Sequence, residues 1–259
     1  RPADRPNAWR VLTNIGWLFA ARILRLGVGL VVSVWIARYL GKEQFGQLSY
    51  ATAFVGLFLP FALLGLESVV VRDLVREPAR AHETMGSAFG LKLLAGLISY
   101  ALAIGVVLWT EPDDRVVQWL IILVGATILF STFDTIDYWF QSRVRSKYTV
   151  IARNTSFLIT AVVRVVLILA AAPVVAFAAA IAVEAVLTAL GLLIVYRASG
   201  SRPRDWQGTR GRARELLSAS WPLMFTGLAV AVYLRIDQIM LKEMLGDAEV
   251  GVYPAAPRI

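Results

Sequence analysis

The stretch VLTNIGWLFAARILRLGVGLVVSVWIA, Val11–Ala37, decides the fold class, because it is long and apolar enough to cross a membrane as one helix. The hydrocarbon core of a bilayer is about 30 Å thick, so a spanning helix needs about 20 mostly apolar residues. The run is too long for the apolar part of a cleavable signal peptide, and further apolar runs follow it. It therefore predicts the first of several membrane-spanning helices.

Six more runs of the same kind follow along the chain. They are Phe45–Val71, Thr84–Trp109, Val116–Gln141, Tyr148–Ala171, Pro173–Tyr196 and Ala219–Leu241. Pro60 and Pro222 lie inside two of these runs, and each is expected to kink its helix because proline lacks a backbone N–H. Hydrophobic residues make up 58% of the chain and charged residues 17%, whereas soluble proteins average about 45–50% and about 25%. The sequence thus predicts an all-α polytopic membrane protein.

The basic residues alternate between the connections of these helices. Three lie on one set of connections, namely Arg38, Lys42 and Arg115. Fifteen lie on the other set, namely Arg1, Arg5, Arg10, Arg72, Arg76, Arg80, Arg143, Arg145, Lys147, Arg197, Arg202, Arg204, Arg210, Arg212 and Arg214. Lys and Arg are enriched in cytoplasmic loops, so the bias predicts a cytoplasmic N-terminus. Topology thus accounts for the net charge of +8 without a nucleic-acid partner.

An internal repeat predicts two lobes. The pattern L-G-x-x-x-[apolar]-G occurs at Leu40–Gly46, after the first helix, and again at Leu245–Gly251, after the seventh. Six helices separate the copies, and an even number keeps both in the same orientation, as in parallel transporter repeats. We therefore expect a six-helix lobe over residues 1–196, a basic linker over 197–218 and the start of a second lobe over 219–259.

Two details refine this expected division. Residues Arg212–Ser218 of the linker have the character of a short amphipathic surface helix. The chain begins at Arg1 and ends just after the second copy of the motif, and we expect it to be part of a longer protein.

Motifs of catalysis and cofactor binding are missing from the sequence. It has no cysteine, and it contains neither a G-x-x-x-x-G-K-[ST] phosphate loop nor the H-E-x-x-H and G-x-S-x-G patterns. The expected connections are too short for a soluble catalytic domain. We therefore expect no enzyme activity, no cofactor and no metal.

Arg22 and Arg25 are the first candidates for a binding site. They lie near the middle of the first predicted helix at i, i+3 spacing, which places both on one face. Each would cost about 2.5–3.5 kcal/mol if it faced lipid, so both are expected to face a cavity or an anionic partner. Guanidinium groups bind phosphate with paired hydrogen bonds. The alternative is a structural ion pair with a neighbouring helix.

Other charged residues within the spans extend the candidate site. The further candidates for substrate binding are Lys92, Arg164 and Arg235, and those for ion coupling are Asp134, Asp137, Glu184 and Asp237. Asp134 and Asp137 share one helix face, and they either bind a cation or proton or pair with the arginines. Arg164 and Glu184 are expected near mid-membrane on adjacent helices, and the alternative to a site role is that they neutralise each other. Lys92 either attracts phosphate at the cavity mouth or extends to the membrane interface.

Three stretches together resemble the Wzx-type O-antigen and polysaccharide flippases of the MOP (multidrug/oligosaccharidyl-lipid/polysaccharide) exporter superfamily. They are ARYLGKEQFG at Ala37–Gly46 followed by LSYA at Leu48–Ala51; LGLE at Leu64–Glu67 running on to VRD at Val71–Asp73; and RIDQIML at Arg235–Leu241 followed by LGD at Leu245–Asp247 and VGVY at Val250–Tyr253. The resemblance covers essentially the whole chain.

This resemblance implies two six-helix lobes around a cationic central cavity with alternating access, in the bacterial inner membrane. It implies transport of an undecaprenyl-pyrophosphate-linked oligosaccharide, driven by a gradient of H⁺ or Na⁺ rather than by ATP, and polysaccharide-assembly proteins as possible partners. Only the idea of cavity arginines is carried over to particular positions, namely Arg22 and Arg25.

Three other functions remain open from the sequence alone. A cation-coupled drug exporter of the same fold would need an acidic cavity. A membrane glycosyltransferase or polymerase would need acidic catalytic residues on a sizeable outer loop, and the expected outer loops are short. A scaffold that only recruits partner enzymes would keep the cavity charges without transporting anything.

Overall fold

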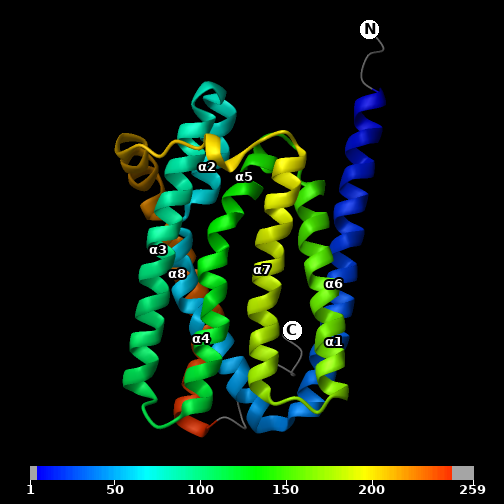
Figure 1. Ribbon diagram of the computed structural model, residues 1–259, viewed down its shortest axis with the longest axis vertical. Coiled ribbons are helices and arrows are strands. Elements are labelled where there is room, and N and C mark those ends of the chain that lie inside the picture. The colour runs from blue at the N-terminus through cyan, green and yellow to red at the C-terminus, as the bar shows by residue number, and fades with distance from the viewer. Residues whose placement is uncertain (1–4, 247–259) are drawn as a thin grey trace.

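The computed structural model describes residues 5–246, and these form a bundle of long helices without a strand (Figure 1). The long helices are α1 (Arg5–Leu63), α3 (Ala81–Thr110), α4 (Arg115–Phe130), α6 (Lys147–Leu169), α7 (Val174–Ala198) and α8 (Arg210–Leu245). The shorter ones are α2 (Leu66–Arg76), α5 (Asp134–Ser142) and the 3₁₀ turns η1 (Pro78–Arg80), η2 (Ser131–Phe133) and η3 (Pro203–Asp205). The all-α prediction is confirmed.

Six helical segments of the described residues are long and apolar enough to cross a membrane. The first, Arg25–Arg76, is 52 residues long, and one crossing needs only about 20. It contains the predicted span Phe45–Val71 and the second half of the predicted span Val11–Ala37. The helix leaves helical geometry at Gly41 (φ 72°, ψ 178°), where the chain reverses direction (Figure 1). The chain is therefore a multi-pass membrane protein.

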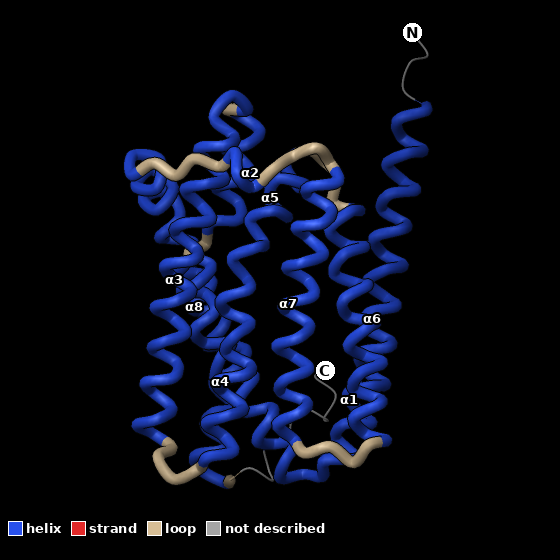
Figure 2. The backbone as a smooth tube through the Cα atoms, in the orientation of Figure 1, coloured by secondary structure: helices blue, strands red, loops and turns tan. Residues whose placement is uncertain are grey.

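Loops collect at two opposite ends of the bundle (Figure 2). The upper end in this view carries the loops between α5 and α6 and between α7 and α8; the lower end carries the reversal at Gly41 and the loops between α3 and α4 and between α6 and α7. The predicted highly basic connections thus share the upper end. Gly246, the glycine of the second motif, has φ 88° and ψ 176°, nearly the conformation of Gly41, as expected for equivalent turns of a repeat. The rest of that second copy lies outside the described residues.

Two hydrophobic clusters form the core. One surrounds Tyr50, Ile121 and Phe177, and the other surrounds Phe140 and Tyr196. Many large apolar side chains point outward instead, for example along α3. An apolar exterior over a partly polar interior is what a bilayer requires, because the lipid offers no partner to polar groups.

Three predicted boundaries were wrong. The span at Val116–Gln141 is interrupted by the 3₁₀ turn η2, and the span at Phe45–Val71 breaks at Leu64 and Gly65, which have positive φ angles. Pro60 lies inside α1, and its kink stays a prediction. The seventh helix begins at Arg210, so Arg212–Ser218 is the first part of α8 and not a separate surface helix. In each case hydrogen bonds and packing with other elements decide the boundary, and composition does not report them.

Candidate functional site

The first group of charged residues, here called the Glu184 cluster, consists of Arg25, Thr160, Arg164 and Glu184; Arg164 and Glu184 are partly buried and Arg25 is more exposed. Glu184 on α7 accepts hydrogen bonds from Arg164 (2.7 Å) and Thr160 (3.2 Å) on α6 and from Arg25 (3.2 Å) on α1. The predicted pairing of Arg164 with Glu184 is therefore present, and Arg25 joins it. Arg25 also lies over the ring of Phe157, 5.1 Å from its centroid. Two guanidinium groups share one carboxylate, so the cluster carries a positive excess.

A cavity of about 350 Å³, here called the lower cavity, adjoins this cluster. Residues of α1, α6, α7 and α8 line it, and they include Arg164 from α6 and Arg235 from α8. Arg235 also donates to the backbone carbonyl of Thr52 at 3.0 Å and packs against Gly56, which has no side chain to exclude it. The remaining polar lining residues are Ser33, Ser49, Thr52 and Gln238. Two predicted substrate-binding arginines, far apart in sequence, thus line one cavity.

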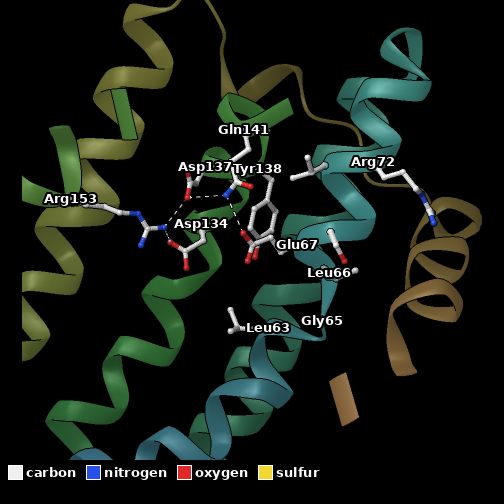
Figure 3. A pocket seen from close by; sticks show the side chains of 12 residues that line it. Leu63, Gly65, Leu66, Glu67, Arg72, Asp134, Asp137, Tyr138, Gln141 and Arg153 are labelled. Atoms are coloured by element: carbon white, nitrogen blue, oxygen red, sulfur yellow. Dashed lines mark hydrogen bonds and ion pairs between the residues drawn. The ribbon is translucent and has the colours of Figure 1, made fainter. Parts of the chain in front are cut away.

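The second group of charges, here called the Asp134 cluster, consists of Glu67, Asp134, Asp137, Gln141 and Arg153 (Figure 3). Arg153 on α6 donates to Asp134 (2.7 Å) and Asp137 (3.2 Å) on α5. The amide of Gln141 donates to Asp137 (3.3 Å) and to Glu67 on α2 (3.1 Å). All five side chains line an open cavity of about 870 Å³, here called the upper cavity.

The 3₁₀ turn η2 determines where Asp134 and Asp137 lie, and Lys92 on α3 stabilises that turn by a hydrogen bond. The side chain of Lys92 is fully buried, and its Nζ donates to the carbonyl of Ser131 (2.7 Å) and to the hydroxyl of Tyr138 (3.2 Å). The ammonium group thus satisfies a carbonyl at the helix break, as a buried polar group requires. The sequence predicted Lys92 either at a cavity mouth or at the membrane interface, and in this conformation it lies at neither. Its role as a substrate ligand stays a prediction.

The comparison with protein families decides what kind of bundle this is. Residues 11–259 match the family described as "Polysaccharide biosynthesis protein". The chain belongs to this family. Its members are flippases of the MOP superfamily, so the resemblance identified in the sequence is confirmed.

A solved structure supports the fold. The chain is similar to a transporter described as "Inward-facing conformation of a multidrug resistance MATE family transporter of the MOP superfamily", with a TM-score of 0.54 and 17% sequence identity. The similarity covers 88% of this chain and 56% of that one, so the chain spans a little over half the length of its structural neighbour. No curated protein sequence matches the chain.

The remaining predicted site residues of this family member, Arg22 and Asp237, lie on α1 and α8. Arg22 is exposed on α1, and no hydrogen bond or ion pair joins it to another described residue. Asp237 accepts from the backbone N–H of Gln238 at 2.8 Å. Of Arg235 and Asp237, it is Arg235 that lines the lower cavity.

Arg153 is the residue that sequence reasoning missed. Asp134 and Asp137 were expected to bind a cation or to pair with Arg22 and Arg25, and the structure pairs them with Arg153 instead. The spacing of Arg153 and Arg164 was a signal in the sequence that Arg153 faces the bundle interior as Arg164 does. The two residues are eleven positions apart, which is three helical turns, so both lie on one face of α6, about 16 Å apart along its axis.

Proposed function

We propose that the full-length protein moves undecaprenyl-pyrophosphate-linked oligosaccharide across the bacterial inner membrane by alternating access. The observation that carries this proposal is the lower cavity, where Arg164 and Arg235 come from helices of the two expected lobes. A cavity lined from both lobes is where an alternating-access transporter holds its substrate. Shared family membership supports a polysaccharide precursor as the cargo.

The chemistry of the lower cavity suits a pyrophosphate that carries a sugar. Guanidinium groups bind phosphate oxygens with two parallel hydrogen bonds, and the hydroxyl side chains of Ser33 and Ser49 offer donors and acceptors for sugar hydroxyls. The Glu184 cluster adds its positive excess beside the cavity. A dianionic headgroup would there offset charges that cost energy inside the membrane.

The Asp134 cluster is proposed to bind the coupling ion, H⁺ or Na⁺. Three carboxylates line the upper cavity, from Glu67, Asp134 and Asp137, and Arg153 is the guanidinium that pairs with two of them. Arg72 also lines this cavity, but its guanidinium pairs with Asp73 at 2.9 Å. With that pair set aside and the buried ammonium of Lys92 counted, one negative charge remains in excess. The upper end is proposed to be cytoplasmic, following the bias of basic residues. An ion gradient then supplies the energy.

The test uses the full-length protein in proteoliposomes loaded with a fluorescent undecaprenyl-pyrophosphate-linked sugar. Each hydrogen bond to a charged group contributes about 1.5–3 kcal/mol, so Arg164→Gln and Arg235→Gln should each lower translocation by roughly ten- to a hundredfold. Arg145→Gln removes a charge from an exposed loop position and should leave translocation unchanged. Wild-type rates in both cavity variants at equal protein levels would contradict the assignment.

A second candidate, a cation-coupled drug exporter, is favoured by the carboxylate excess of the upper cavity. Such an exporter would hold a cationic drug against Asp134 and Asp137. Asp134→Asn and Asp137→Asn would then abolish drug resistance in cells that retain normal surface glycan. A flippase predicts the opposite pattern, with surface glycan lost and drug resistance unaffected.

A further inference from the structure

The connection between α7 and α8 is held tightly against the first helices. The indole N–H of Trp206 donates to the hydroxyl of Tyr196 at 2.9 Å, and its ring packs on Phe89 with centroids 5.3 Å apart. The backbone of Gln207 passes so close to Gly86 that a Cβ there would lie 2.6 Å from a main-chain carbon. This segment is therefore not a loose linker, although its glycines and prolines predict one.

The first turn of α8 is fixed to α3 in the same way. The backbone N–H of Thr209 donates to Ser87 Oγ at 3.1 Å, and that hydroxyl donates back to the carbonyl of Thr209 at 3.3 Å. The hydroxyl of Thr209 donates to Glu83 at 2.6 Å. Thr209 also caps α8, because its side chain accepts from the N–H of Arg212. One residue thus joins the start of α8 to the start of α3.

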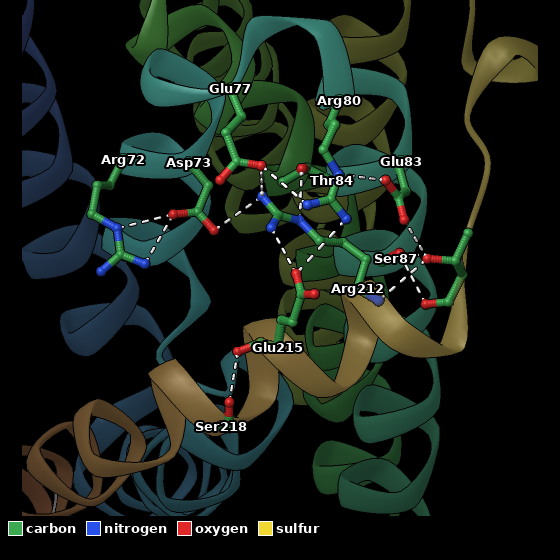
Figure 4. A network of polar contacts seen from close by, with 11 residues as sticks. Arg72, Asp73, Glu77, Arg80, Glu83, Thr84, Ser87, Arg212, Glu215 and Ser218 are labelled. Atoms are coloured by element: carbon green, nitrogen blue, oxygen red, sulfur yellow. Dashed lines mark hydrogen bonds and ion pairs between the residues drawn. The ribbon is translucent and has the colours of Figure 1, made fainter.

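Arg212 adds a buried ionic contact to this attachment (Figure 4). Its side chain is only 4% exposed, and it donates to Thr84 (3.1 Å), to Asp73 (3.2 Å) and to Glu215 (2.8 Å). It also lies 3.6 Å from a carboxylate oxygen of Glu77. The guanidinium has all three nitrogens engaged by α2, α3 and α8. It resists displacement, because each partner lost leaves its buried charge less compensated. Trp206, Thr209 and Arg212 with their partners are here called the upper anchor.

The lower part of α8 is attached to α1 and to the loop between α3 and α4. Arg235 donates to the carbonyl of Thr52, and Ile239 and Leu241 pack against the core cluster around Tyr50. Lys242 pairs with Glu111 beside the loop between α3 and α4, and its Nζ lies 3.9 Å from the ring centroid of Tyr50. Figure 1 shows the red end of α8 beside that loop. Between the two ends, many side chains of α8 lie exposed on the surface of the described chain, including Phe225 and Tyr233. The ion pair between Lys242 and Glu111 is here called the lower latch.

A natural bending point lies between these two attachments. Pro222 interrupts the hydrogen-bond ladder of α8, because it has no N–H to donate to the carbonyl of Ser218. One residue further on, the backbone of α8 touches Gly65: a Cβ at Gly65 would lie 2.7 Å from the nitrogen of Met224 and 2.9 Å from the carbonyl carbon of Leu223. Close backbone contact beside a weakened helix provides a pivot.

We propose that α8 is a hinged lever, in which the upper anchor stays with the first lobe while the part below Pro222 swings away from it when the lower latch breaks. Arg235 lies on the swinging part and Arg164 on α6, so the swing widens the lower cavity between them. The lower latch then decides whether that cavity is closed at the lower end. This inference concerns motion and holds for any cargo.

Distances between spin labels in the full-length protein test the proposal directly. The chain contains no cysteine, so labels attach only at cysteines introduced within it, at exposed positions. The upper pair is Arg76→Cys with Arg214→Cys, and the lower pair is Trp109→Cys with Met244→Cys. Double electron–electron resonance gives the distance distribution of each pair.

Glu111→Gln should add a longer population to the lower pair and leave the upper pair unchanged. Lys242→Gln should do the same, and the exchanged variant Glu111→Lys with Lys242→Glu should restore the wild-type distribution. Asp113→Asn, which removes an exposed carboxylate from the same loop, should change neither pair. Pro222→Ala restores the missing donor and should reduce the longer population of Glu111→Gln.

Two results would overturn the proposal. If the upper pair lengthens together with the lower pair, α8 moves as one rigid body and there is no anchored arm. If neither Glu111→Gln nor Lys242→Gln changes the lower pair, the ion pair is not a latch. Neither result depends on transport. The hinged-lever proposal can therefore be wrong while the proposed flippase activity is right, and the flippase proposal can be wrong while the hinged lever is right.

Discussion

Replacing Glu184 with glutamine tests whether one carboxylate holds two arginines inside the bundle. The substitution keeps the shape of the side chain and removes the charge that accepts hydrogen bonds from Arg25, Arg164 and Thr160. The side chains of Arg164 and Glu184 are 15% and 16% exposed, so this pair is largely shielded. Removing one partner of a buried ion pair costs about 3–5 kcal/mol, because the other charge stays buried without compensation. Proteins have a total free energy of unfolding of only about 5–15 kcal/mol, so this loss would be a large fraction of the stability.

A double-mutant cycle isolates the pair from the rest of the cluster. Glu184→Gln, Arg164→Gln and the double variant are unfolded by denaturant in detergent micelles, and the free energies of unfolding are compared. Residues joined by a direct ion pair should show a coupling energy of about 1–3 kcal/mol, so the double variant should be more stable than the sum of the single losses implies. Glu43→Gln, the same substitution at an exposed position of α1, should change the free energy of unfolding by less than about 0.5 kcal/mol.

Additive losses would refute this reasoning. They would mean that Glu184 and Arg164 do not stabilise each other, and that the positive excess beside the lower cavity is not held in place by this carboxylate. A loss in Glu184→Gln equal to that of Glu43→Gln would refute it as well, because a shielded and an exposed carboxylate would then be equivalent.

Three further substitutions test the backbone and the upper anchor, with thermal unfolding as the measurement. Gly41→Ala should lower the free energy of unfolding by about 1–3 kcal/mol, because the backbone conformation of Gly41 is essentially restricted to glycine. The control is Gly90→Ala, in an ordinary helix with open space around it, which should leave the free energy of unfolding unchanged or raise it. Gly86→Ala should lower the free energy of unfolding by about 1–3 kcal/mol, because the added methyl group overpacks against the connection to α8. If Gly86→Ala is as stable as Gly90→Ala, the close contact between Gly86 and that connection is excluded. Arg212→Met should lower the free energy of unfolding by about 1.5–3 kcal/mol, because it removes the charge-assisted hydrogen bond to Asp73, whose side chain is 13% exposed. Arg214→Gln at an exposed position should lower it by less than about 0.5 kcal/mol; equal effects would contradict the anchor.

The spans were predictable because a bilayer imposes a simple rule on each helix separately. About 20 apolar residues in a row can be recognised without knowing any neighbour, and the runs at Thr84–Trp109 and Pro173–Tyr196 closely match α3 and α7. The reversal at Gly41 was also predictable, because the repeated motif contains it. These are local features, and local features survive in a single sequence.

The partners of the charges were not predictable, because they depend on how helices pack. Asp134 and Asp137 had several arginines to choose from, and only the antiparallel packing of α5 against α6 selects Arg153. The attachment of Trp206 to Tyr196 was hidden for the same reason. Glycines and prolines around Trp206 predict a loop correctly, but they do not tell whether that loop is free or fixed.

The two clusters of charge differ in sign, and this difference bears on how a transporter would use them. Around Glu184 guanidinium groups outnumber carboxylates, whereas around Asp134 carboxylates outnumber the cations. An uncompensated charge inside a membrane is costly, so each proposed ligand would stabilise its cluster: an anion at the first, and a proton or cation at the second. Because α6 carries an arginine of each cluster on one face, any rotation of α6 would disturb both at once, and the two ligands would be coupled through that helix.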